Sequence, residues 1–171
     1  LARIRGEIRT SWIVEPADGR VPWREDIKKQ LGIGQTRVEE YDHVEQRPND
    51  ERCLTARGAG APILNSPDTN LVQIVQTPDH VVIVSEKNHD ARIVRLGAAA
   101  AGSVAPGGWM GASVGRWEGA TLVVTTSGFR PGLTRANGLT VSDKTRVTER
   151  FTRTGPREIT YLFEVEDASL Y

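Results

Sequence analysis

A short stretch, Ser85 to Ile93, brings together the side-chain types that could move protons. It contains Glu86, His89, Asp90 and Arg92. A histidine beside a carboxylate can be held in one tautomer and act as a general acid or base. An arginine next to them can bind a carboxylate or an oxyanion. The stretch is therefore a candidate catalytic site, with Glu86 or Asp90 orienting the imidazole.

The same stretch also has the composition of a turn between two strands. Apolar runs precede and follow it, and Asn88 and Asp90 suit turn geometry. On a regular strand His89 and Asp90 would point to opposite faces, so a direct pair between them requires a turn or a bulge. We expect a hairpin first and a site second.

A second candidate for proton transfer is Glu149, because it lies on the apolar face of a predicted strand. Val147, Glu149 and Phe151 alternate with polar residues. Burial disfavours the charged form of a carboxylate, which suits a general acid or base. The interpretation that we favour is a buried ion pair with an arginine such as Arg52 or Arg116.

Aromatic and thioether side chains are candidates for contact with an apolar ligand. Trp109 and Met110 lie among glycines at a predicted junction between a loop and a strand. Phe151 and Tyr161 lie on the apolar faces of the last two predicted strands. These four residues form the predicted substrate-binding set, whereas we interpret Trp117 as a core residue that plugs a barrel end.

The sequence offers little support for metal or cofactor chemistry. Cys53 is the only cysteine, and no cysteine–histidine spacing typical of zinc sites occurs. The Gly-x-Gly pattern in residues 31–36 lacks the third glycine and the βαβ context of a dinucleotide site. We therefore predict no metal and no cofactor, and we interpret Cys53 as a packing residue rather than a nucleophile.

Composition and charge restrict the class of partner. The 171 residues carry 22 Lys and Arg and 22 Asp and Glu, so the formal net charge is zero. This balance removes the electrostatic argument for nucleic acid or an acidic membrane as partner. No apolar run approaches the roughly 20 residues of a membrane-spanning helix. We predict a single domain over residues 1–171, and a homodimer is compatible with the sequence.

The elements that must position these side chains are mostly strands. An amphipathic helix is predicted at residues 23–32, and a long irregular loop at residues 33–70. Short turns without crossover helices predict an all-β, mainly antiparallel meander that closes into a barrel, with a two-sheet sandwich as the alternative. Strands are predicted at residues 7–14, 71–77, 80–86, 91–96, 120–129, 145–153 and 158–167.

Two motifs, G-R-W-E-G-x-T-L-V-V at residues 115–124 and E-R-F-T-R at residues 149–153, resemble a family of exported bacterial proteins found in sphingomonads and acidobacteria. The resemblance covers most of the chain in the same order. It implies a lipocalin-like β-barrel, and a periplasmic or secreted protein whose leader is absent from this chain. It implies no particular reaction.

The chain departs from the family pattern where members carry histidine. Ala112 and Val141 stand at positions where family members commonly have a histidine before a serine. If those histidines serve a common chemistry, this protein has lost that chemistry or performs another.

Three functions remain open. The first is a cofactor-independent enzyme, an isomerase, cyclase or lyase, that acts on a small hydrophobic substrate in a barrel cavity. The alternative is a lipocalin-like carrier of a hydrophobic small molecule, which the missing histidines favour. The third is an interaction module that uses threonine-rich faces for strand-edge pairing. For the enzyme, the predicted catalytic residues are His89, Glu149, Asp90, Glu86 and Arg92.

Overall fold

The chain forms two compact units, one of Leu1–Arg37 with Ser169–Tyr171 and the other of Val38–Ala168. Strands predominate in the part of the chain that the structure describes, which confirms the all-β prediction. Among those residues, no helix has the length and apolar character that a membrane crossing requires. The computed structural model describes residues 2–4, 7–9, 13–30, 43–44, 47, 49, 51–65, 70–97, 108–131 and 139–171.

The smaller unit holds a two-stranded hairpin and one α-helix. β1 (Ala2–Ile4) pairs with β2 (Glu7–Arg9) in antiparallel orientation, and α1 spans Glu25–Gln30. The helix has two acidic residues in its first turn and two basic residues in its last turn, the order that the helix dipole favours. The helix predicted at residues 23–32 is therefore confirmed in its central part. Of the strand predicted at 7–14, β2 covers the first three residues, residues 13–14 are not in a strand, and residues 10–12 lie outside the described residues.

The last residues of the chain pack beside the segment that precedes α1. The rings of Trp23 and Tyr171 lie 4.9 Å apart, and the amide of Arg24 donates a hydrogen bond to the carbonyl of Leu170 at 3.1 Å. α1 itself buries no residue. Because an isolated helix of this length is unstable in water, such contacts next to it matter for its formation.

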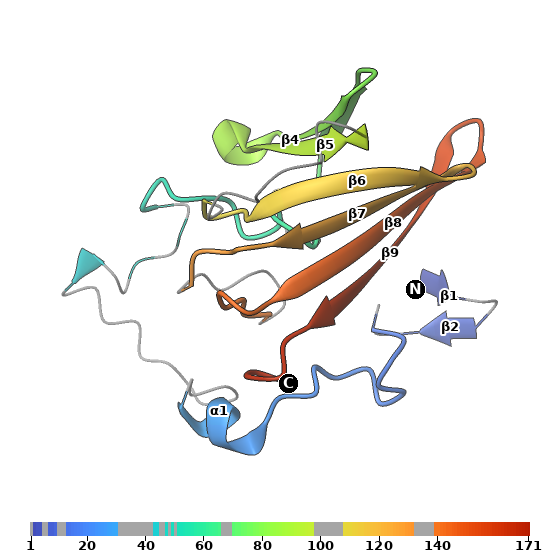
Figure 1. Ribbon diagram of the computed structural model, residues 1–171. Coiled ribbons are helices and arrows are strands. Elements are labelled where there is room, and N and C mark those ends of the chain that lie inside the picture. The colour runs from blue at the N-terminus through green and yellow to red at the C-terminus, as the bar shows by residue number, and fades with distance from the viewer. Residues whose placement is uncertain are drawn as a thin grey trace. The chain divides into compact units, whose positions relative to one another are not determined.

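The larger unit is built on one seven-stranded sheet that curls into a half-barrel (Figure 1). Neighbouring strands are antiparallel except for β5 and β6, which are parallel. The strand order and the mainly antiparallel pairing predicted for a meander are confirmed. The predicted closure into a full barrel is not, since β3 and β9 are two edges of a half-barrel. The strands follow in sequence order: β3 (Val72–Gln76), β4 (His80–Ser85), β5 (Ala91–Leu96), β6 (Ala112–Glu118), β7 (Thr121–Ser127), β8 (Arg146–Gly155) and β9 (Glu158–Glu166).

β6 is a strand of this sheet that the sequence pattern did not predict. A Cβ atom added to Gly115 would lie 2.7 Å from Cγ1 of Val94 and 2.9 Å from Cδ2 of Leu96. Glycine therefore allows β6 to pack closely against β5. The same glycine interrupts the alternation of apolar and polar side chains, which is the local signal for a strand.

The concave face of the half-barrel carries the main apolar core. The pairings of Glu149 with Phe163 and of Phe151 with Tyr161 confirm the faces predicted for β8 and β9. A second apolar cluster lies near the start of β8 and includes Val147. The main core consists of Val81, Ile83, Val94, Leu96, Leu122, Val124 and Phe151.

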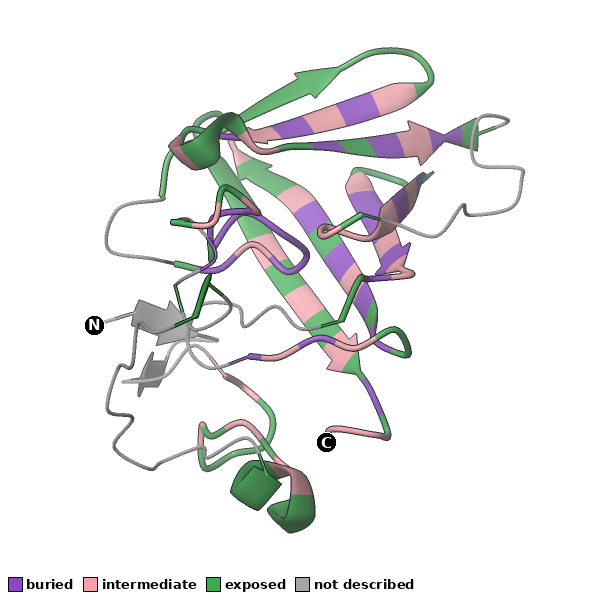
Figure 2. Cartoon of the chain, turned by 90° about the vertical axis from the view of Figure 1, so that its left-hand side faces the viewer, coloured by how far each residue is buried: buried purple, intermediate pink, exposed green. Residues whose placement is uncertain are grey.

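Residues 51–65, which we call the packed segment, lie against this core, and most of residues 55–64 are buried (Figure 2). Ala61 belongs to the second cluster, and Ile63 packs against the main core. The described parts of the irregular loop predicted at residues 33–70 contain no strand and no α-helix. This segment is nevertheless a packed part of the fold, since it supplies side chains to both apolar clusters.

Candidate functional site

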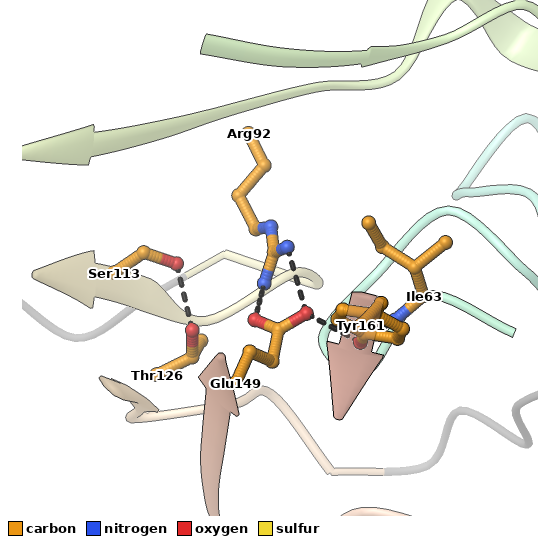
Figure 3. A network of polar contacts seen from close by, with 6 residues as sticks. All are labelled: Ile63, Arg92, Ser113, Thr126, Glu149 and Tyr161. Carbon is orange, nitrogen blue, oxygen red and sulfur yellow. Dashed lines mark hydrogen bonds and ion pairs between the residues drawn. The ribbon is translucent and has the colours of Figure 1, made fainter. Parts of the chain in front are cut away.

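A buried ion pair joins β5 and β8 on the concave face (Figure 3). Both terminal nitrogens of Arg92 donate to the carboxylate of Glu149, with Nη2 3.0 Å from Oε1. The side chain of Arg92 is 2% exposed and that of Glu149 is 0% exposed. Burial of a charge is costly unless a partner compensates it. The bidentate pair of hydrogen bonds between the guanidinium and the carboxylate compensates both buried charges.

The sequence correctly predicted a buried ion pair for Glu149 but named the wrong arginines. Arg116 instead pairs with the exposed Glu118 at 2.6 Å. Alternation on β6 turns Gly115 and Trp117 toward the concave face and Arg116 away from it. Arg52, the other arginine named, does not pair with Glu149 either, because Arg92 takes that position from β5.

Tyr161 on β9 extends the network to a third strand and to the packed segment. Its hydroxyl donates to Oε1 of Glu149 at 2.7 Å and accepts a hydrogen bond from the amide of Ile63 at 2.8 Å. Desolvation and the negative charge of Glu149 raise the pKa of Tyr161 well above its ordinary value. The hydroxyl therefore stays protonated and serves as a fixed donor.

Arg92 remains charged inside the core. Desolvation lowers the pKa of Arg92, but the charge and hydrogen bonds of Glu149 outweigh it and leave that pKa raised. Among the described residues, Nε of Arg92 and the hydroxyl of Ser85 are buried without a hydrogen-bond partner. Beside the network, the hydroxyls of Ser113 and Thr126 lie 2.8 Å apart and satisfy each other.

The stretch from Ser85 to Ile93 forms a turn at one end of the half-barrel, which confirms the hairpin prediction. The turn is the 3-10 element η2 (Lys87–His89), in which Asn88 and His89 have φ values of 59° and 53°. The side chains of Glu86 and His89 are exposed. Neither forms an ion pair or hydrogen bond with Glu149 within the described residues, so their catalytic roles stay predictions.

Asp90 holds the packed segment in place at this same end. Its Oδ2 accepts hydrogen bonds from the hydroxyl of Thr55 at 2.9 Å and from the amide of Ala56 at 2.7 Å. The sequence suggested instead that Asp90 orients His89, and that role stays a prediction. The anchoring role was missed because the partners are more than 30 residues away in the chain.

A pocket of about 180 Å³ lies at the opposite end of the half-barrel. Three hairpin turns lie at this end, at residues 77–79, 119–120 and 156–157, and we call it the hairpin end (Figure 1). The pocket is lined by Ile74, Gln76, Val81, Ile83, Trp117, Ala120, Leu122, Phe151, Arg153 and Ile159. The part of its wall that the structure describes is therefore apolar except for one amide and one guanidinium.

The predicted substrate-binding residues are divided between different places. Phe151 lines the pocket, and Tyr161 packs on Phe151 with ring centroids 4.8 Å apart. Trp109 and Met110 precede β6, at the end away from the pocket, and the guanidinium of Arg130 lies 4.7 Å from the Trp109 ring.

Trp117 was interpreted as a core residue that plugs a barrel end, and this interpretation is wrong. Its side chain is 47% exposed and forms part of the pocket wall. Trp117 lies next to the turn between β6 and β7, where the sheet ends and offers less cover. A half-exposed tryptophan at a concave site is typical of a surface that contacts a ligand.

Cys53 is exposed, which corrects its interpretation as a packing residue. Its φ value of 53° places it in a turn of the packed segment, and this turn directs the thiol outward. Within the described residues, no group of three or more His, Cys, Asp or Glu side chains could hold a metal ion.

Comparison of the chain with models of protein families, with curated proteins and with solved structures finds no match. The resemblance to a family of exported proteins therefore stays a prediction. The geometry of the pocket and of the buried network beside it is what indicates a function.

Proposed function

We propose that this protein binds a small, compact apolar molecule in the pocket at the hairpin end. The observation that carries the proposal is a pocket of about 180 Å³ whose wall is almost entirely apolar. An apolar cavity of about 150 Å³ accommodates a benzene molecule. The ligand is accordingly a single ring or a short branched chain.

The rim of the pocket exposes large apolar side chains to water. Ile74 is 44% exposed, Trp117 47% and Ile159 55%. Covering apolar surface is favourable by roughly 25 cal/mol per Å². A ligand that covers these three side chains removes their exposed apolar surface from water, and this makes binding favourable.

The floor of the pocket is held by the buried network. Phe151 forms part of the floor and packs on Tyr161, whose hydroxyl is fixed by Glu149. A wall that does not rearrange on binding loses less conformational entropy. The ion pair between Arg92 and Glu149 thus supports binding by keeping the pocket in shape, without contact with the ligand.

An acid–base enzyme, the first expectation from the sequence, remains a proposal with less support. Both oxygens of Glu149 are already engaged, by Arg92 and by Tyr161. His89 lies in η2, at the end of the half-barrel away from the pocket. Of the residues that line the pocket, only Arg153 carries a charge.

Titration of the ¹⁵N-labelled protein with toluene tests the proposed function. We expect the indole N–H signal of Trp117, assigned with Trp117→Phe, to shift with a Kd of roughly 0.1–1 mM. Ala120→Phe should fill the pocket and abolish the shift. Ile93→Phe is the matched control, because Ile93 is 57% exposed and lies outside the pocket. Absence of a saturable shift, or unchanged binding by Ala120→Phe, would contradict the proposal.

A further inference from the structure

We propose that the ligand of this pocket carries one anionic head, a carboxylate or a similar oxyanion, that binds Arg153. The inference rests on the proposed function and adds the chemical class of the ligand. That class is a small organic acid with a compact apolar body.

Arg153 is placed at the pocket by the alternation of β8. It lies two residues beyond Phe151, on the same face of the strand, and both side chains line the pocket. If the apolar body of a ligand packs on Phe151, the end of the ligand that points along β8 toward Arg153 would therefore lie beside the guanidinium.

The guanidinium of Arg153 is oriented by its own hairpin. Nε donates to the carbonyl of Gly155 at 3.1 Å, and Nη2 donates to the carbonyl of Pro156 at 3.0 Å. These carbonyls fix the plane of the group but carry no net charge to neutralise it. Within the described residues, the N–H groups of Nη1 and the second N–H of Nη2 remain for an acceptor.

The positive charge of Arg153 has no carboxylate within ion-pair distance among the described residues, in contrast to Arg92, Arg116 and Arg150 of the same sheet. Arg116 and Arg150, on the opposite face, share Glu118 at 2.6 Å and 3.0 Å. Arg92 is neutralised by Glu149 in the core. The charge that faces the apolar pocket is left to be matched by a ligand.

Such a pairing is favourable at this position. An arginine presents two parallel N–H groups that match the geometry of a carboxylate. An apolar body seated in the pocket displaces water beside the pair, and lower polarity strengthens the attraction between opposite charges. Neutral ligands of equal size gain the apolar contact alone.

Benzoate and benzamide test the inference, because they have the same shape and differ in charge. With the Trp117 indole signal as the readout, we expect benzoate to bind about five- to tenfold more tightly than benzamide at low salt. Arg153→Gln should remove this preference, so that benzoate and benzamide bind alike. Arg157→Gln, an exposed arginine in the same turn that does not line the pocket, should keep the preference.

Salt dependence provides a second measurement that does not rely on a variant. Raising NaCl from 20 to 500 mM should weaken benzoate binding and leave toluene binding unchanged, since salt screens exposed charges. Equal binding of benzoate and benzamide, or no binding of either, would overturn the inference, and toluene binding would still support the proposed function. If toluene also fails to bind, the proposed function fails with it.

Discussion

At the scale of single residues, the carboxylate of Glu149 connects three parts of the half-barrel. It receives hydrogen bonds from Arg92 on β5 and Tyr161 on β9, while it is itself carried by β8. A buried ion pair of this kind contributes little net stability compared with an apolar replacement. Removal of one partner is different, because it leaves the other charge buried alone.

Replacement of Glu149 by glutamine should therefore destabilise the protein strongly. The variant keeps the shape of the side chain but leaves the Arg92 guanidinium uncompensated, and we expect a loss of about 3–5 kcal/mol in the free energy of unfolding. Urea denaturation followed by circular dichroism measures this loss. Glu118→Gln is the control, since its pairs with Arg116 and Arg150 are exposed and water screens them. A mild effect of Glu149→Gln, similar to that of the control, would contradict the structural role.

The raised pKa of Tyr161 predicts a loss of stability at alkaline pH. An unfolded tyrosine ionises near pH 10, whereas the folded protein holds this proton to higher pH. The contribution of the protonated Tyr161 hydroxyl to the free energy of unfolding is therefore complete below about pH 10. Above that pH it decreases by up to about 1.4 kcal/mol per pH unit.

Urea midpoints measured between pH 9 and pH 11.5 test this prediction. Tyr161→Phe should show a shallower decline with pH than the parent protein, because the ionising hydroxyl is gone. Tyr171→Phe, in the smaller unit, should keep the decline of the parent. Equal slopes for the parent and Tyr161→Phe would show that the phenol is not held in its protonated form.

At the scale of elements, the parallel pairing of β5 with β6 depends on a close approach of the two strands. Gly115 provides this approach, since its missing side chain leaves room for Val94 and Leu96. Both of these residues belong to the main apolar core. The strand that the sequence pattern did not predict is therefore important for the packing of the whole sheet.

Gly115→Ala should destabilise the sheet through overpacking. The added methyl group would contact Val94 and Leu96 at 2.7 Å and 2.9 Å, so one of the strands must shift. We expect a loss of about 1–3 kcal/mol in the free energy of unfolding. Gly108→Ala is the control, because among the described residues no atom outside its chain neighbours lies within 4 Å of its added Cβ. Thermal denaturation of both variants measures the change in stability. If Gly115→Ala were as stable as the parent protein, the close pairing of β5 and β6 would be contradicted.

At the scale of the larger unit, the half-barrel has three levels along its axis. The hairpin end holds the apolar pocket, the middle holds the pair of Arg92 and Glu149, and the end with η2 anchors the packed segment through Asp90. Of the polar residues that looked most like a catalytic site, Arg92 and Glu149 lie in the middle of the half-barrel, and Asp90 lies at the end with η2. The proposed ligand-binding function belongs to the hairpin end.

The sequence by itself determined the features that depend on neighbouring residues. Side chains alternate along a strand with a period of two, so the faces of β8 and β9 and the inward direction of Glu149 could be predicted. The turn after β4 could be predicted from Asn88 and Asp90 in the same way. Each of these properties is encoded within a few positions of the chain.

Only the tertiary structure decided which distant residues meet. The choice of Arg92 over Arg52 or Arg116 depends on the curl of the sheet, which brings β5 opposite β8 although two strands separate them. The pocket likewise requires residues from both edges of the sheet, Ile74 on β3 and Ile159 on β9. Strand order and curvature are properties of the whole sheet, and local alternation carries no information about them.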